Sequence, residues 1–75
     1  MKTNFEIRGE LITLDALLKA LGIADSGAQA KMIIAEGYVQ VDGKVETRKA
    51  RKLRGGEVVV LDDIEITLIA DPSIK

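Results

Sequence analysis

The 75-residue chain contains neither cysteine nor histidine. Without cysteine it can form no disulfide, no thiolate metal site and no thiol nucleophile. Without histidine it also lacks the most common metal ligand and the usual general base, so zinc sites and Ser-His-Asp chemistry are excluded. The composition therefore predicts a protein that is not an enzyme and that uses no metal or cofactor.

Long apolar runs are also missing from the chain. No stretch approaches the roughly 18 residues that span a bilayer, and the N-terminus has no apolar core of a secretory signal. We therefore expect a soluble, cytoplasmic protein that makes no membrane contact. With one proline and no repetitive tract, residues 1–75 are expected to fold as a single small domain, with flexibility confined to the tail at 71–75.

Positive charge is concentrated in one stretch, KVETRKARKLR at 44–54, called the basic segment below. It holds six of the eleven Lys and Arg residues and one carboxylate, a local charge of +5, although the net charge of the whole chain is −1. The acidic counterweight is expected to lie on the opposite side of the molecule, largely at Glu57, Asp62, Asp63, Glu65 and Asp71.

Two short helices are predicted in the first half of the chain. Leucines at helical spacing follow Thr13, an expected N-cap, and Gly22 is suited to the left-handed C-terminal position. The second helix is predicted from Ser26, which with Gln29 forms a capping-box pattern, to Gly37. Its apolar face is expected to comprise Ala30, Ile33 and Ile34.

Strands are predicted on both sides of the helices. The alternation in NFEIRGE at 4–10 indicates an edge strand, and Val39 and Val41 begin a hairpin that turns at Asp42-Gly43. After Gly55-Gly56, further strands are predicted at 57–61 and 64–70. The expected fold class is α+β, with the order β-α-α-β-β-β-β and both helices packed on a mainly antiparallel sheet.

The predicted core joins the helices to the strands. It comprises Leu14, Leu17, Leu18, Leu21, Ile33, Ile34, Val39, Val41 and Val58.

The basic segment has two interpretations, a solvated surface or a binding site for phosphates. A solubilising surface would intersperse the two signs of charge, whereas a local excess of Arg and Lys suits the repeated phosphates of a nucleic acid. Single-strand binders stack bases on aromatic rings, and this chain offers only Phe5 and Tyr38. Structured RNA, recognised by its shape, is therefore the preferred partner.

Several short patterns occur in a defined order between residues 13 and 60. They are Leu-Asp-x-x-Leu at 14–18, Ser26 with Gln29, Ala30 and Lys31, Glu36-Gly37, Val39-x-Val41-Asp42-Gly43-Lys44, and Gly56-Glu57-Val58. This order resembles the S-four domain, an RNA-binding module named after the fourth protein of the small ribosomal subunit, in its short stand-alone bacterial form. The resemblance implies two helices followed by a hairpin, with surfaces that meet ribosomal RNA, transfer RNA or a ribosomal particle.

The resemblance also implies where the RNA contacts lie: at the start of the second helix, on the hairpin and in the basic segment. The residues at these places are Ser26, Gln29, Lys31, Tyr38, Lys44, Arg48 and Lys49. Gly27 stands where most S-four domains have an arginine, and Arg51, Lys52 and Arg54 are expected to compensate for this loss.

Each of these assignments has a structural alternative. Ser26 and Gln29 also fit a capping box without RNA, and Tyr38 could simply cover the hairpin. For the whole chain, the alternatives are a helix-turn-helix DNA-binding protein and an adaptor that binds proteins through its acidic strands. The preferred interpretation is a monomeric, non-catalytic RNA-binding protein without a small-molecule substrate.

Overall fold

The computed structural model describes residues 1–73, and the last two residues of the predicted tail lie outside this part. Within residues 1–73 the chain forms two helices and seven strands. The helices are α1 (Leu14–Ala20) and α2 (Gly27–Ala35). The strands are β1 (Lys2–Glu6), β2 (Ile12–Thr13), β3 (Val39–Val41), β4 (Lys44–Val45), β5 (Lys52–Leu53), β6 (Val58–Leu61) and β7 (Ile64–Ile69).

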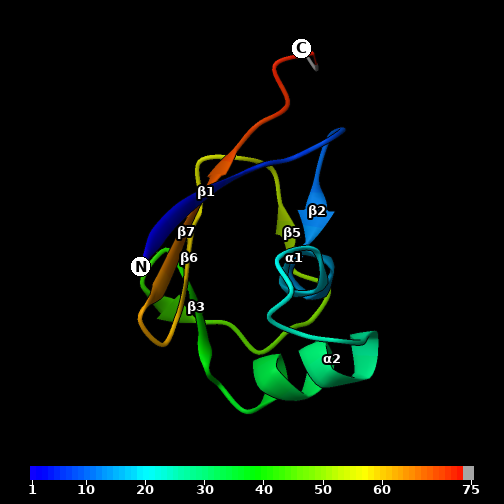
Figure 1. Ribbon diagram of the computed structural model, residues 1–75, viewed down its shortest axis with the longest axis vertical. Helices are drawn as coiled ribbons and strands as arrows, with labels where there is room; N and C mark the ends of the chain where they lie inside the picture. Colours follow the sequence, from blue (N-terminus) through cyan, green and yellow to red (C-terminus); the bar gives the residue numbers. More distant parts are fainter. Residues whose placement is uncertain (74–75) are drawn as a thin grey trace.

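Five strands form the main sheet in the order β1-β7-β6-β3-β4. Its pairs are antiparallel except β1 with β7, which are parallel. The predicted α+β fold class is therefore confirmed, as is the position of the first strand at a sheet edge. In Figure 1 the main sheet occupies one side of the molecule, and α1, α2 and the β2–β5 pair occupy the other.

The small β2–β5 sheet was not predicted from the sequence. It joins Ile12 to Leu53 and Thr13 to Lys52 in antiparallel register. Two-residue strands are too short to show an alternating pattern, so no sequence signal marks them. The pairing anchors the end of the basic segment beside the start of α1.

The helix ends largely follow the predicted caps. Ser26 Oγ accepts a hydrogen bond from the Gln29 backbone N–H at 3.1 Å, and Gln29 Oε1 accepts one from the Asp25 N–H at 2.6 Å. Thr13 is the N-cap of α1 but its side chain makes no capping bond. The first amides of α1 donate instead to carbonyl oxygens of the basic segment, Leu14 to Arg51 at 2.9 Å and Asp15 to Lys49 at 3.0 Å.

The hydrophobic core lies between the main sheet and the helices. Its fully buried members include Leu14, Leu17 and Leu18 from α1. The prediction that Val58 belongs to the core was wrong. In β6 the buried residue is Val59, and Val58 is only half-buried. Val59 lies opposite Val41 and Ile66, both buried, so the pairing register decides which face of β6 points inward.

The β3–β4 hairpin turns at Asp42-Gly43, as predicted. Both residues have positive φ, 53° and 84°, which is typical of a type I′ turn. Asp42 also ties the turn to β6: its N–H donates to the Val58 carbonyl at 2.9 Å, and its Oδ1 accepts from the Val58 N–H at 3.0 Å. The hairpin that begins the basic segment is therefore held against the main sheet.

The other end of the described chain is also tied to the fold. Asp71 Oδ2 accepts a hydrogen bond from the Gly9 N–H at 2.8 Å, and its Oδ1 accepts from Ser73. Neither described helix has the length and apolar character needed to cross a membrane.

Candidate functional site

The basic segment consists of β4, a loop at residues 46–51, and β5 with Arg54. The backbone fixes the loop at both ends. The Glu46 N–H donates to the Val39 carbonyl at 2.9 Å, and the carbonyls of Lys49 and Arg51 accept from the first amides of α1. The loop is thus held between the hairpin and the start of α1, where tertiary contacts define its path.

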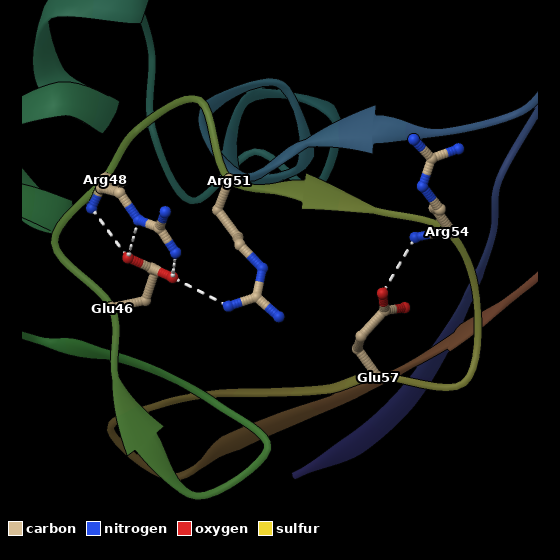
Figure 2. Close-up of polar contacts among 5 residues, drawn as sticks. All are labelled: Glu46, Arg48, Arg51, Arg54 and Glu57. Carbon is tan, nitrogen blue, oxygen red and sulfur yellow. Dashed lines mark hydrogen bonds and ion pairs between the residues drawn. The ribbon is translucent and has the colours of Figure 1, made fainter.

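Glu46, the single carboxylate of the basic segment, is the first residue of the loop and is only 7% exposed. Its Oε2 accepts from the backbone N–H and the Nε of Arg48, both at 3.1 Å. Its Oε1 accepts from Arg48 Nη2 at 3.1 Å and from Arg51 Nη1 at 2.9 Å. Figure 2 shows both guanidinium groups converging on this carboxylate.

These contacts define the protonation state of Glu46. The side-chain hydrogen bonds from Arg48, and next the one from Arg51, lower the pKa of the carboxyl group from 4.5 to about 2. The same carboxylate raises the pKa of Arg48 above its ordinary value. Glu46 and Arg48 are therefore charged near neutral pH, and part of the segment's positive charge is balanced within the loop.

Two neighbouring surface hollows bring five of the predicted site residues together. One hollow is lined by Arg48, Lys49, Ala50, Arg51 and Lys52. The other is lined by Val41, Asp42, Lys44, Val45, Glu46, Arg48 and Arg51. Because the two arginines line both hollows, the hairpin lysine and the loop cations share one surface, which we call the basic face (Lys44, Arg48, Lys49, Arg51 and Lys52).

The other predicted site residues occupy different positions. Ser26 and Gln29 bond to each other at the start of α2, and Lys31 is exposed on that helix. Tyr38 is 59% exposed and lines a separate, mainly apolar hollow with Ile23, Ile33, Leu61 and Asp62. Within residues 1–73, no hydrogen bond or ion pair connects these four side chains to the basic face.

Arg54 lies at the end of the basic segment. Its backbone N–H donates to Glu57 Oε2 at 3.0 Å, while its guanidinium points away from that carboxylate (Figure 2). Glu57 was expected on the opposite side of the molecule, and that expectation was wrong, because a tight turn brings its side chain back to the amides of Arg54 and Gly55. Another acidic residue, Glu65, pairs with Lys2 at 3.9 Å across the β1–β7 edge.

Sequence reasoning did not identify the role of Glu46. The available signal was a single carboxylate two residues before one arginine and five before another. This spacing does not by itself show that both guanidinium groups bind Glu46, because that contact depends on the path of the loop. In the described part of the chain, no three Asp or Glu side chains gather in a way that could hold a metal ion.

Comparisons with known proteins identify the family. A family model described as the S4 domain, the S-four domain named above, matches residues 5–69. The chain is 48% identical over 59 residues to the "Putative RNA-binding protein YbcJ" of Escherichia coli (strain K12), which covers 79% of this chain and 84% of that protein. It is 36% identical over 62 residues to the "Probable ribosome maturation protein RlbA" of Bacillus subtilis (strain 168), covering 83% and 87% of the two chains.

A solved structure supports the same assignment. The solution structure of YbcJ from E. coli, described as revealing an αL motif involved in RNA binding, matches with a TM-score of 0.62 and 40% identity. The match covers 92% of this chain and 86% of the YbcJ chain. The structural match, the sequence identity and the matched family model agree, and this chain therefore belongs to the S4 domain family.

Proposed function

We propose that this protein binds structured RNA of the ribosome, as free ribosomal RNA or within a ribosomal particle, and catalyses no reaction. The observation that carries the proposal is the basic face, where five Lys and Arg residues surround two adjoining hollows. The names of the relatives, which refer to RNA binding and ribosome maturation, support this choice of partner.

The cations of the basic face are suited to different parts of the task. Lys44, Lys49 and Lys52 are exposed, and their flexible ammonium groups can follow phosphates as point charges. Arg48 and Arg51 are held by Glu46 and present planar guanidinium groups, which match phosphate oxygens in a defined orientation. A surface with these groups recognises the spacing of phosphates, which depends on the shape of the RNA.

The remaining predicted contacts extend this proposal beyond the basic face. Lys31 and the capped start of α2 would offer a second positive region, and Tyr38 would offer a ring for a base or a ribose. Arg54 would reach a phosphate beyond β5. In the described structure none of these side chains forms a hydrogen bond or ion pair with Glu46, Arg48 or Arg51. We therefore assign them peripheral RNA contacts.

The test replaces the three exposed lysines, Lys44, Lys49 and Lys52, with glutamine. These side chains make no described hydrogen bond or ion pair, so the fold should persist. Binding to bacterial ribosomal RNA is measured at several salt concentrations. Each lost phosphate contact removes about 0.7–0.9 from the log–log salt slope, so the slope should fall by about 2–3 units and the affinity should fall with it.

A matched control removes three charges elsewhere, at Lys2, Arg8 and Lys19. Lys2 lies on β1, at the sheet edge opposite β4, Arg8 lies between β1 and β2, and Lys19 lies in the last turn of α1. None of the three lines either hollow of the basic face. The control changes net charge equally but should keep most of the affinity and slope. Equal effects of the two triple variants would contradict a localised site.

The choice of RNA is tested with the same proteins. Transfer RNA and duplex DNA are measured beside ribosomal RNA at one salt concentration. Preferential binding of ribosomal RNA supports the proposal, whereas preference for transfer RNA or for DNA rejects the ribosomal target.

A further inference from the structure

Glu46 is unexpected in a surface that binds phosphates. It is a buried, ionised carboxylate within the most positive stretch of the chain. By Coulomb's law alone, this negative charge should weaken the attraction of the basic face for a phosphate. If long-range charge were the main requirement, a neutral side chain at this position would serve better.

The hydrogen bonds of Glu46 leave donor capacity on both arginines. Arg48 uses Nε and one hydrogen of Nη2, so the hydrogens of Nη1 and the second hydrogen of Nη2 remain available to a ligand. Arg51 uses one hydrogen of Nη1 and retains Nε, Nη2 and the second Nη1 hydrogen. No other acceptor for these groups occurs among the hydrogen bonds of residues 1–73.

Exposure shows that the available donors can reach a ligand. The side chain of Arg48 is 73% exposed and that of Arg51 is 34% exposed, whereas that of Glu46 is 10% exposed. The carboxylate therefore lies beneath the two guanidinium groups, with the arginines on the solvent side. Figure 2 shows the arginines extending from different points of the loop toward this single acceptor.

The contacts of Glu46 lower the net positive charge of the basic face, but they also fix the orientation of both arginine side chains. A free arginine must lose rotamer freedom when it grips a phosphate, and that loss weakens binding. An arginine already fixed by a carboxylate loses less on binding, because its orientation was set during folding. The backbone contacts of the loop to Val39 and to α1 hold Glu46 and Arg51 in place, and the Arg48 carbonyl accepts from the Arg51 N–H at 3.2 Å. The orientation of the arginines is therefore set by the fold.

We propose that Glu46 is a positioning residue of the RNA-binding surface, which fixes Arg48 and Arg51 so that both guanidinium groups meet phosphates of one RNA strand in a defined geometry. The inference rests on the proposed function. It differs from a general electrostatic role because it assigns a favourable effect on RNA binding to a negative charge.

The test replaces Glu46 with glutamine and measures affinity for bacterial ribosomal RNA. Glutamine keeps the size of the side chain but has one acceptor oxygen and an N–H₂ group that cannot accept from arginine. The variant is more positive by one charge, yet we expect it to bind about tenfold more weakly, which corresponds to about 1.4 kcal/mol. The matched control is Glu36→Gln, which makes the same charge change at the exposed end of α2 and should bind as tightly as the wild type, or more tightly.

A second set of variants keeps every charge and tests the same geometry. Arg48→Lys and Arg51→Lys retain the positive charge but lose the planar fork that Glu46 holds. Each should weaken binding at fixed salt with little change in the salt slope, whereas Arg8→Lys, the same substitution at an exposed arginine outside the basic face, should not weaken it. If Glu46→Gln does not fold, these variants still test the positioning role of Glu46. Circular dichroism shows at which temperatures each variant is folded.

The outcomes separate the two proposals. If the wild type binds RNA and Glu46→Gln binds equally or more tightly, the positioning role is rejected while the proposed function stands. Where Glu46→Gln is unfolded, unchanged binding by both arginine variants rejects the positioning role. If the wild type shows no salt-dependent binding to ribosomal RNA, the proposed function itself fails.

Discussion

At the scale of single residues, burial and hydrogen bonding distinguish side chains that appear equivalent in the sequence. Glu46 and Glu57 are both carboxylates near arginines, but only Glu46 is buried beneath two guanidinium groups. Glu57 instead accepts from backbone amides of a turn. The two side chains therefore have different roles, one in orienting cations and the other in fixing the chain.

Leu18 tests the core at this scale. It is fully buried between the helices and the main sheet, and its replacement by alanine would leave a cavity. We expect Leu18→Ala to lower the free energy of unfolding by about 2–5 kcal/mol, measured by urea denaturation. Leu21→Ala is the control, because Leu21 is only partly buried and should cost less. Equal losses would mean that burial does not determine these energies.

The lowered pKa of Glu46 predicts a dependence of stability on pH. A carboxyl group whose pKa falls from 4.5 to about 2 on folding stabilises the protein fully above about pH 4.5, and this contribution is lost as the pH falls toward 2. The free energy of unfolding of the wild type should therefore decline through this window. Asp71 contributes in the same direction, because the Gly9 N–H and then Ser73 lower its pKa to about 2.

Urea unfolding at about pH 7, 4.5, 3 and 2 measures this decline, and Glu46→Gln separates the two carboxyl groups. The variant should be less stable near pH 7 and should show a shallower decline, since only the contribution of Asp71 remains. A variant curve parallel to that of the wild type would show that Glu46 does not change its protonation on folding.

At the scale of elements, the β3–β4 hairpin controls where the basic segment begins. The turn residue Gly43 has a φ of 84°, and an added Cβ would meet no atom within 4 Å. Any penalty for a larger side chain there comes from backbone conformation and not from a clash.

We therefore expect Gly43→Val to lower the free energy of unfolding by about 1–2 kcal/mol and to weaken RNA binding without a change in charge. The control is Gly27→Val, because Gly27 also has open space around it but has no positive φ. Its effect on stability, measured by urea unfolding, should be smaller. A folded Gly43→Val protein with unchanged RNA affinity would show that the turn does not position the basic face.

At the scale of the whole molecule, the net charge of −1 hides an uneven distribution. The basic face gathers five cations, while Lys2 and Glu65 form an ion pair at the far edge of the main sheet. A nearby phosphate responds to the local surface more than to the net charge, because salt screens charges beyond about 8–10 Å.

The edges of the main sheet bear on the oligomeric state. One edge strand, β4, has only two residues, and the other, β1, carries an exposed lysine. Short or charged edges disfavour pairing between molecules. We expect sedimentation equilibrium to give the mass of a single chain at micromolar concentration, and a mass that rises with concentration would contradict this expectation.

The sequence by itself determined much of this protein. The caps at Ser26 and Gly22, the hairpin turn at Asp42-Gly43 and the mainly antiparallel sheet were all predictable, because each depends on contacts between neighbouring residues or on a simple period. The concentration of positive charge in the basic segment was also visible, because it is a property of composition.

Only the tertiary structure decided how that charge is arranged. The register of β6 placed Val59 rather than Val58 in the core, and this depends on which strands lie on either side. The two-residue β2–β5 pair and the carbonyl contacts to α1 set the path of the loop. That path brings Arg48 and Arg51 onto Glu46, since hydrogen bonds form between groups that are close in space, and the spacing of residues along a loop does not fix that closeness.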